Sequence, residues 1–167
     1  NWAALQNQDI FCPIYVEGAG IEVDQFLLEV VTTAGSGGAT NTLRAGIYAA
    51  NGNWQPTKLM VDGGTVSIAT TGVKTITPGA VTRLPPGRYL IAFNYDSTAG
   101  PTLRTVGVAQ HVGSYTAALG ATIGNRTWRV ARTFAAFTDP GTAWDTASNA
   151  NGLYLYPIFL RLSAGDS

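Results

Sequence analysis

The sequence predicts an all-β fold built as an antiparallel β-sandwich, and three observations support this prediction. Apolar and polar residues alternate with a period of two in several short runs, whereas the 3.6-residue period of an amphipathic helix is nearly absent. Glycine is frequent, at 20 of 167 residues, and charged residues make up only 12%. Turn-forming residues separate the runs roughly every 8 to 12 residues, as in known sandwiches.

Chain length favours one domain, because 167 residues can bury a continuous hydrophobic core without disulfides. No linker or change in composition divides the chain, so we expect residues 1–167 to form a single β-sandwich domain. The chain begins at Asn1, with no initiator Met and no signal-peptide pattern. We therefore expect it to be a fragment or a processed part of a longer protein.

The first strands are predicted in residues 21–33 and 43–48. In residues 21–33 the apolar positions shift phase near Asp24 and Gln25, which predicts a β-bulge there. Residues 43–48 alternate regularly and are followed by Asn51-Gly52, a pair that supplies the positive φ angles of a tight hairpin turn. We expect a hairpin at this point.

Three shorter strands are predicted next, in residues 58–61, 65–69 and 73–77. Asp62-Gly63-Gly64 and Thr71-Gly72 separate them as predicted turns. The strongest strand follows a Pro-Pro-Gly turn and covers residues 88–95, which are apolar on both faces for most of their length. We expect this strand to lie in the centre of a sheet.

The C-terminal third is predicted to contain long loops, because the alternation weakens between about residues 109 and 151. Only residues 127–131 read as a strand within this stretch. Residues 152–162 predict a last strand, in which Pro157 cannot donate a ladder hydrogen bond. Loops of such length in a compact domain are often functional, so we look for binding residues there.

Charge and composition exclude several partners. Ten Lys and Arg balance ten Asp and Glu without a basic run, so nucleic acid is not an expected partner. The longest apolar stretch, residues 153–162, is shorter than the ~20 residues that cross a bilayer, so no membrane insertion is expected. Cys12 is the only cysteine, which excludes an intrachain disulfide and predicts a buried, unreactive thiol.

No catalytic, cofactor or metal site is predicted. His111 is the only histidine and has no nucleophile motif beside it. Glu22 and Asp24 lie two residues apart and point to the same side of a strand, as a carboxylate pair would, but an outer sheet face in water is the interpretation we favour. Asp139 and Asp145 lie in loops without a calcium-loop pattern. We therefore predict that the chain is not an enzyme and has no cofactor.

Aromatic residues in the loop regions are the candidate ligand-binding residues. Flat rings stack on the C–H face of neutral sugars, and polar neighbours bind the hydroxyl groups. The predicted site consists of Trp54, Tyr115, Trp128 and Trp144 with Arg126 and Asp145. The alternative is that the tryptophans close the ends of the sandwich or lie in contacts between chains.

An ordered series of short motifs extends this interpretation. The motifs are VVTTAGSGG (30–38), LRAGIYAANG (43–52), LMVDGGTV (59–66), TTGVK (70–74), LPPGRYL (84–90) and PTLR (101–104), with a closing strand at 154–162. In this order the sequence resembles a module of phage tail-fibre and tail-tip proteins. The resemblance covers most of the chain except the loops from His111 to Asn151.

The resemblance implies a jelly-roll type of β-sandwich that is displayed on a virion and exposed to the extracellular medium. It also implies a homotrimer that contacts other virion tail proteins and attaches to a host-surface glycan or protein. The shared motifs are architectural and bring no catalytic residues with them.

Three functions remain open from the sequence. The first is a receptor-binding or adhesion module of a phage tail fibre or tail tip. The second is a structural virion component, such as a fibre, capsid-attached or decoration domain. The third is a glycan-degrading enzyme domain, which a close carboxylate pair in a cleft would favour.

Overall fold

The computed structural model describes residues 2–3, 7–33, 40–96, 100–104, 128–141 and 158–162. Its described elements are all strands, and every pair is antiparallel, which confirms the predicted all-β fold. The strands are β1 (Trp2–Ala3), β2 (Gln8–Val16), β3 (Ile21–Thr32), β4 (Thr42–Ala50), β5 (Pro56–Ser67), β6 (Gly72–Ile76), β7 (Thr82–Leu84), β8 (Gly87–Asp96), β9 (Thr102–Leu103), β10 (Trp128–Ala131) and β11 (Ile158–Leu162).

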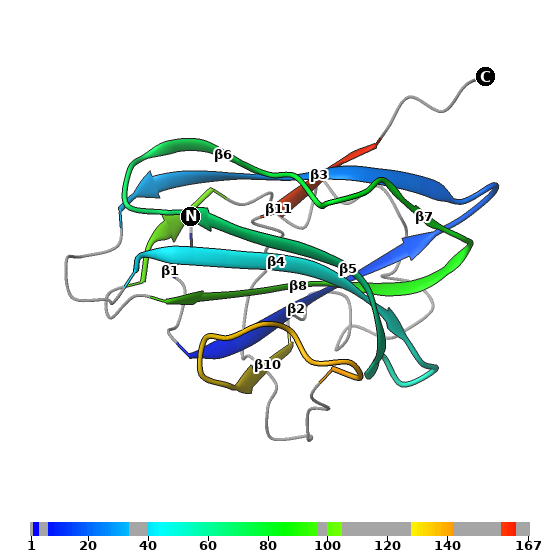
Figure 1. Ribbon diagram of the computed structural model, residues 1–167. Helices are drawn as coiled ribbons and strands as arrows, with labels where there is room; N and C mark the ends of the chain where they lie inside the picture. The colour runs from blue at the N-terminus through cyan, green and yellow to red at the C-terminus, as the bar shows by residue number, and fades with distance from the viewer. Residues whose placement is uncertain are drawn as a thin grey trace.

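The strands form two sheets that lie one above the other (Figure 1). The five-stranded sheet has the order β10-β2-β8-β4-β5. The six-stranded sheet has the order β1-β9-β3-β11, and β6 and β7 pair one after the other with β3. Within the described part of the chain, no helix is long and apolar enough to cross a membrane.

The main hydrophobic core lies between the two sheets. Alternate residues of β2, β4 and β8 point inward from the five-stranded sheet, and alternate residues of β3 point inward from the six-stranded sheet, because successive side chains of a strand face opposite sides. The largest fully buried side chains here are those of Tyr95, Phe26 and Phe93. Cys12 is 1% exposed and belongs to this core, as expected from its apolar neighbours.

The predicted bulge in β3 is confirmed. Val23 pairs with Leu162 and Gln25 pairs with Arg161, so Asp24 is the extra residue on the β3 side. The buried residues of β3 change phase at the same place, from Val23 to Phe26. The bulge also separates the parts of β3 that pair with β7 and with β6.

The turn predicted at Asp62-Gly63-Gly64 is instead a bulge within the continuous strand β5. Ala45 of β4 pairs with Gly64, and its neighbour Gly46 pairs with Asp62, which leaves Gly63 as the extra residue. A Cβ atom at Gly63 would lie 2.7 Å from the Phe26 ring and 2.8 Å from the Ala45 carbonyl oxygen. Glycine is a common turn residue, which explains the predicted turn, but here its missing side chain allows a close approach of the opposite sheet.

The central position predicted for residues 88–95 is confirmed, because β8 pairs with β2 on one side and with β4 on the other. β10 matches the strand predicted at residues 127–131, and β11 matches the end of the last predicted strand. Residues 152–157, including Pro157, lie outside the described residues.

Candidate functional site

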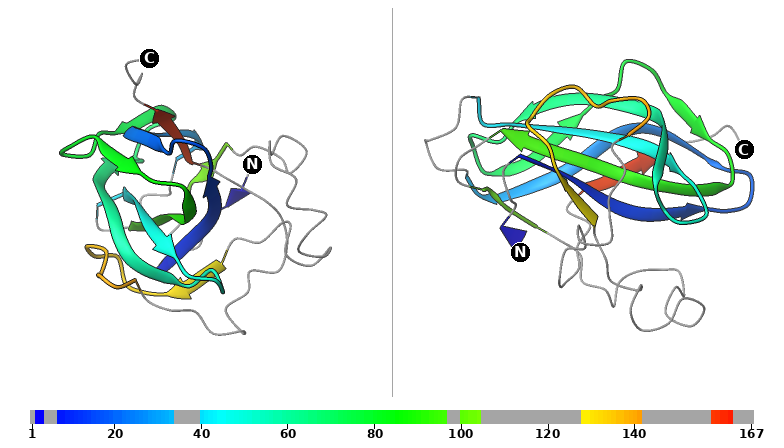
Figure 2. Two further views of the ribbon diagram at one scale, coloured as in Figure 1. Left: turned by 90° about the vertical axis from the view of Figure 1, so that its right-hand side faces the viewer. Right: turned by 90° about the horizontal axis from the view of Figure 1, so that it is seen from below.

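The outer face of the five-stranded sheet carries a second hydrophobic cluster. β10 extends this sheet along β2, and residues 132–141, here called the covering segment, then cross the outer side of the sheet (Figure 2). The buried members of the cluster are Phe11, Tyr48, Trp54, Leu90, Ala92, Trp128 and Phe137. Strand β8 is apolar on both faces, and both faces are buried: one in the main core and the other in this outer cluster.

Phe137 fixes the middle of the covering segment. Its ring meets that of Tyr48 edge to face at 5.8 Å, and Tyr48 meets Phe11 in the same way at 5.9 Å. Gly46 of β4 lies directly below, and a Cβ atom there would come within 3.0 Å of the Phe137 ring and 2.7 Å of the Val61 carbonyl oxygen. The absence of a side chain at Gly46 therefore allows Phe137 to rest on the sheet.

Two polar contacts hold the next residues of the covering segment. The hydroxyl of Tyr48 donates to the backbone carbonyl of Thr138 at 2.8 Å, and the backbone N–H of Leu59 donates to Asp139 Oδ1 at 3.0 Å. The Tyr48 hydroxyl is protonated at neutral pH, and burial raises its pKa further above the ordinary value of 10.0.

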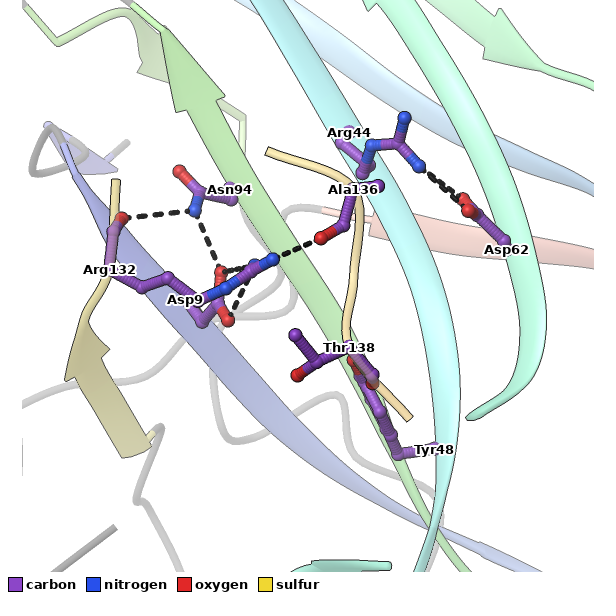
Figure 3. A network of polar contacts seen from close by, with 8 residues as sticks. All are labelled: Asp9, Arg44, Tyr48, Asp62, Asn94, Arg132, Ala136 and Thr138. Atoms are coloured by element: carbon purple, nitrogen blue, oxygen red, sulfur yellow. Dashed lines mark hydrogen bonds and ion pairs between the residues drawn. The ribbon is translucent and has the colours of Figure 1, made fainter. Parts of the chain in front are cut away.

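A buried ion pair fastens the start of the covering segment (Figure 3). Arg132 Nη1 donates to both carboxylate oxygens of Asp9 at 2.9 Å, and Asn94 Nδ2 donates to Asp9 Oδ1 at 2.7 Å. Arg132 also donates to the Ala136 carbonyl. Burial raises the pKa of Asp9 above 3.8, while the Arg132 guanidinium and the Asn94 amide act in the opposite direction.

The opposite end of this face is aromatic, and the β4–β5 turn builds it. Asn51 Oδ1 accepts the backbone N–H groups of Asn53 and Gln55 at 2.9 Å, and the Asn51 carbonyl accepts that of Trp54 at 3.0 Å. The positive φ expected at Asn51-Gly52 is found at Trp54, at 62°. A left-handed backbone costs an L-residue about 1–2 kcal/mol, so the packing of the Trp54 side chain has to offset it.

Trp54 packs against Trp128, the first residue of β10. The two rings are stacked, with centroids 6.3 Å apart and planes 21° apart. Trp54 comes from the β4–β5 turn and Trp128 from the edge strand β10, so the pair joins two distant parts of the chain, and both residues belong to the outer cluster together with Leu90 of β8. We call these two residues the tryptophan pair.

Arg88 lies beside the tryptophan pair, and Tyr15 lies opposite Arg88 on the neighbouring strand. The Arg88 guanidinium carbon is 5.5 Å from the Trp54 ring centroid, and Arg88 Nη1 donates to the Gly52 carbonyl at 2.8 Å. Tyr15 of β2 is the direct cross-strand partner of Arg88, so both side chains project from the same face. Tyr15 is 49% exposed, which makes it the most open ring of this end among the described residues.

The structure brings together two of the six predicted ligand-binding residues. Trp54 and Trp128 form the tryptophan pair, with exposed fractions of 8% and 7%. Tyr115, Arg126, Trp144 and Asp145 lie outside the described residues, as does His111.

Sequence reasoning missed the polar residues of this face. Asp9 stands at the start of an apolar run and Asn94 within one, a pattern that signals a buried polar pair, but the sequence did not indicate Arg132 as their partner. Glu22, which was considered as a catalytic carboxylate, pairs with Arg83 at 3.5 Å. Across the described ranges, no group of three or more His, Cys, Asp or Glu side chains is placed to hold a metal ion.

Comparisons with known proteins identify no relative. No family model, no curated protein and no solved structure matches this chain. Its function therefore has to be argued from the fold and from the outer face of the five-stranded sheet.

Proposed function

We propose that this chain is a virion tail-fibre or tail-tip module, with a β-sandwich of jelly-roll type, that binds a host-surface glycan. The observation that carries the proposal is the aromatic end of the outer face, where the half-exposed Tyr15 lies opposite Arg88 and the buried tryptophan pair supports Arg88 from below. Aromatic rings beside polar groups suit sugars, because rings stack on C–H faces while hydrogen-bond donors engage hydroxyl groups.

The position of this end in the sequence adds to the proposal. Arg126 precedes Trp128 by two residues, and Trp144 follows Gly141, the last residue of the covering segment, by three. We infer that the predicted residues Tyr115, Arg126, Trp144 and Asp145 also contribute to binding.

Binding through a single copy would be weak, and assembly would strengthen it. Copies held together in a homotrimer, on a virion with other tail proteins, raise the effective concentration of each site for a repeating surface glycan. The neutral net charge fits this mode, since specificity then comes from contacts in the site and not from a long-range field.

The test is binding of the labelled, assembled protein to a panel of intact bacterial envelopes and purified surface polysaccharides. We expect saturable binding to one host that is lost in Trp144→Ala or Tyr115→Ala and reduced in Trp54→Phe. Phenylalanine is used at Trp54 because this buried residue also packs the turn. Val73→Ala is the control, since Val73 is 70% exposed on β6 of the other sheet.

A second candidate is a structural virion component, and the burial of the tryptophan pair favours it. Exposed fractions of 8% and 7% are those of packing residues, which close the outer face without contacting a ligand. A verified oligomer that binds no envelope and no polysaccharide would support this function and overturn the receptor-binding proposal.

A further inference from the structure

Arg88 differs from the other arginines whose side chains are described. Arg44, Arg83, Arg104 and Arg132 each form an ion pair, with Asp62, Glu22, Glu29 and Asp9 respectively, at 2.5 to 3.5 Å. Arg88 is exposed, and its contacts within the described chain are the Gly52 carbonyl and the Trp54 ring. Its positive charge therefore faces solvent without a described carboxylate to neutralise it.

We propose that Arg88, held in place by the buried Trp54, and the half-exposed Tyr15 bind a sugar that carries a carboxylate, such as a hexuronic or sialic acid residue. This inference rests on the proposed glycan-binding function and specifies the class of its ligand. It adds Arg88 and Tyr15 to the binding residues and assigns the negative group of the sugar to Arg88.

The geometry of Arg88 suits a carboxylate. A guanidinium group carries five N–H donors in a planar fork that matches the two oxygens of a carboxylate. Nη1 donates to the Gly52 carbonyl, and the described contacts leave Nη2 and Nε for a ligand. The Gly52 contact and the Trp54 ring also hold the guanidinium in one place, which reduces the entropy lost on binding.

Tyr15 supplies the surface for the sugar ring. It is the register partner of Arg88 in the β2–β8 pair, where opposite side chains have Cβ atoms about 4.5–5.5 Å apart. A pyranose whose carboxylate meets Arg88 can therefore lay its C–H face on the Tyr15 ring, which is 49% exposed. A free anion would make only the Arg88 contact, whereas an acidic sugar would make both contacts.

The experiment compares acidic and neutral sugars on the same carrier. Glucuronic, galacturonic and N-acetylneuraminic acid, with glucose and galactose as neutral counterparts, are coupled to one polyacrylamide carrier and titrated against the assembled protein. We expect at least one acidic probe to bind more tightly than both neutral probes. Its affinity should fall with rising NaCl concentration, because an exposed charged contact is screened by salt.

Variants then assign the contacts. Loss of a charge-assisted pair predicts roughly a tenfold or greater loss of affinity for the acidic probe in Arg88→Gln. Arg88→Lys should keep part of the affinity for the acidic probe, since lysine retains the positive charge but lacks the planar fork of donors. Tyr15→Ala should weaken binding, and Tyr15→Phe should not. Arg83→Gln is the matched control, because Arg83 is also exposed but lies in the other sheet and pairs with Glu22.

The outcomes separate this inference from the function on which it rests. If the protein binds host envelopes but no acidic probe exceeds its neutral counterparts, or if Arg88→Gln binds the acidic probe as the wild type does, the inference is wrong and glycan binding stands. If neither envelopes nor any probe is bound, both are wrong. Thermal unfolding of each variant checks that a lost affinity is not a lost fold.

Discussion

Asp9 and Arg132 lie 123 residues apart in the sequence, yet the arginine Nη1 is 2.9 Å from both carboxylate oxygens of the aspartate. Their side chains are 2% and 13% exposed. The pair joins β2 to the start of the covering segment, and Asn94 of β8 donates to the same carboxylate. It thereby fixes the segment that covers the outer face of the five-stranded sheet.

Breaking this pair should destabilise the protein strongly. Asp9→Asn keeps the shape of the side chain but leaves the Arg132 guanidinium without its counter-charge, which should lower the free energy of unfolding by about 3 kcal/mol. Chemical denaturation measures the loss. The control is Asp62→Asn, which removes the more exposed Arg44–Asp62 pair and should cost less than about 1 kcal/mol. Equal losses in the two variants would contradict the role given to Asp9.

Gly46→Ala should displace Phe137 from the sheet. The added methyl group would meet the Phe137 ring at 3.0 Å and the Val61 carbonyl at 2.7 Å, so we expect a loss of about 1–3 kcal/mol from overpacking. Gly79→Ala is the matched control, since no atom lies within 4 Å of a Cβ atom there. Denaturation curves that coincide for Gly46→Ala and the wild type would show that the covering segment does not rest on Gly46.

Tyr48→Phe should weaken the attachment of the covering segment while the sheet stays intact. The variant loses the 2.8 Å hydrogen bond to the Thr138 carbonyl, which typically contributes about 1 kcal/mol. Hydrogen exchange in residues 132–141 should then be faster than in the wild type, whereas exchange in β8 should not change. Tyr15→Phe is the control, because it removes the hydroxyl of a half-exposed tyrosine on β2 and leaves the Tyr48–Thr138 hydrogen bond in place. Unchanged exchange in the segment would contradict the prediction.

Trp128→Ala should behave as a core substitution. Trp128 is 7% exposed and stacks on Trp54, so truncation should lower the free energy of unfolding by about 3–5 kcal/mol. Trp128→Phe should cost less, since an aromatic ring remains. Should Trp128→Ala unfold with the stability of the wild type, the tryptophan pair would have to be open to solvent and available to a ligand.

The pH dependence of one exposed pair follows from the pKa of Glu29. Hydrogen bonds from Arg104, at 2.5 and 3.0 Å, lower the pKa of Glu29 below its ordinary value of 4.5. A lowered carboxyl pKa means that the pair stabilises the fold above pH 4.5 and that this contribution is lost as the pH falls through the lowered pKa. In an NMR titration, the pKa of Glu29 should rise toward 4.5 in Arg104→Gln. An unchanged pKa would contradict the prediction.

Patterns within single strands carried most of the fold prediction. The alternation of residues 88–95 predicted both the strand and its central place, and the phase shift at Asp24 predicted the bulge in β3. Glycine was harder to interpret, because a turn and a close approach of two backbones require the same residue. That ambiguity explains why Gly63 was read as a turn although β5 continues through it.

The candidate site was predicted only in part for a different reason. Trp54 and Trp128 were identified by their residue type, but their stacking depends on β10 joining the edge of β2 while the β4–β5 turn reaches the same face. Likewise, an arginine that has no ion pair with a described carboxylate is recognised only when its neighbours in space are known. Arg88 could not be distinguished from Arg83 or Arg104 in the sequence.

The sequence by itself determined the fold class, the central strand, the β3 bulge and the neutral charge, because each depends on composition or on the period of neighbouring residues. It also indicated that residues 88–95 are apolar on both faces for most of their length. Only the tertiary structure decided that the covering segment supplies the second cover and that Asp9 meets Arg132. Such contacts follow from the order and register of strands, which a period of two leaves open.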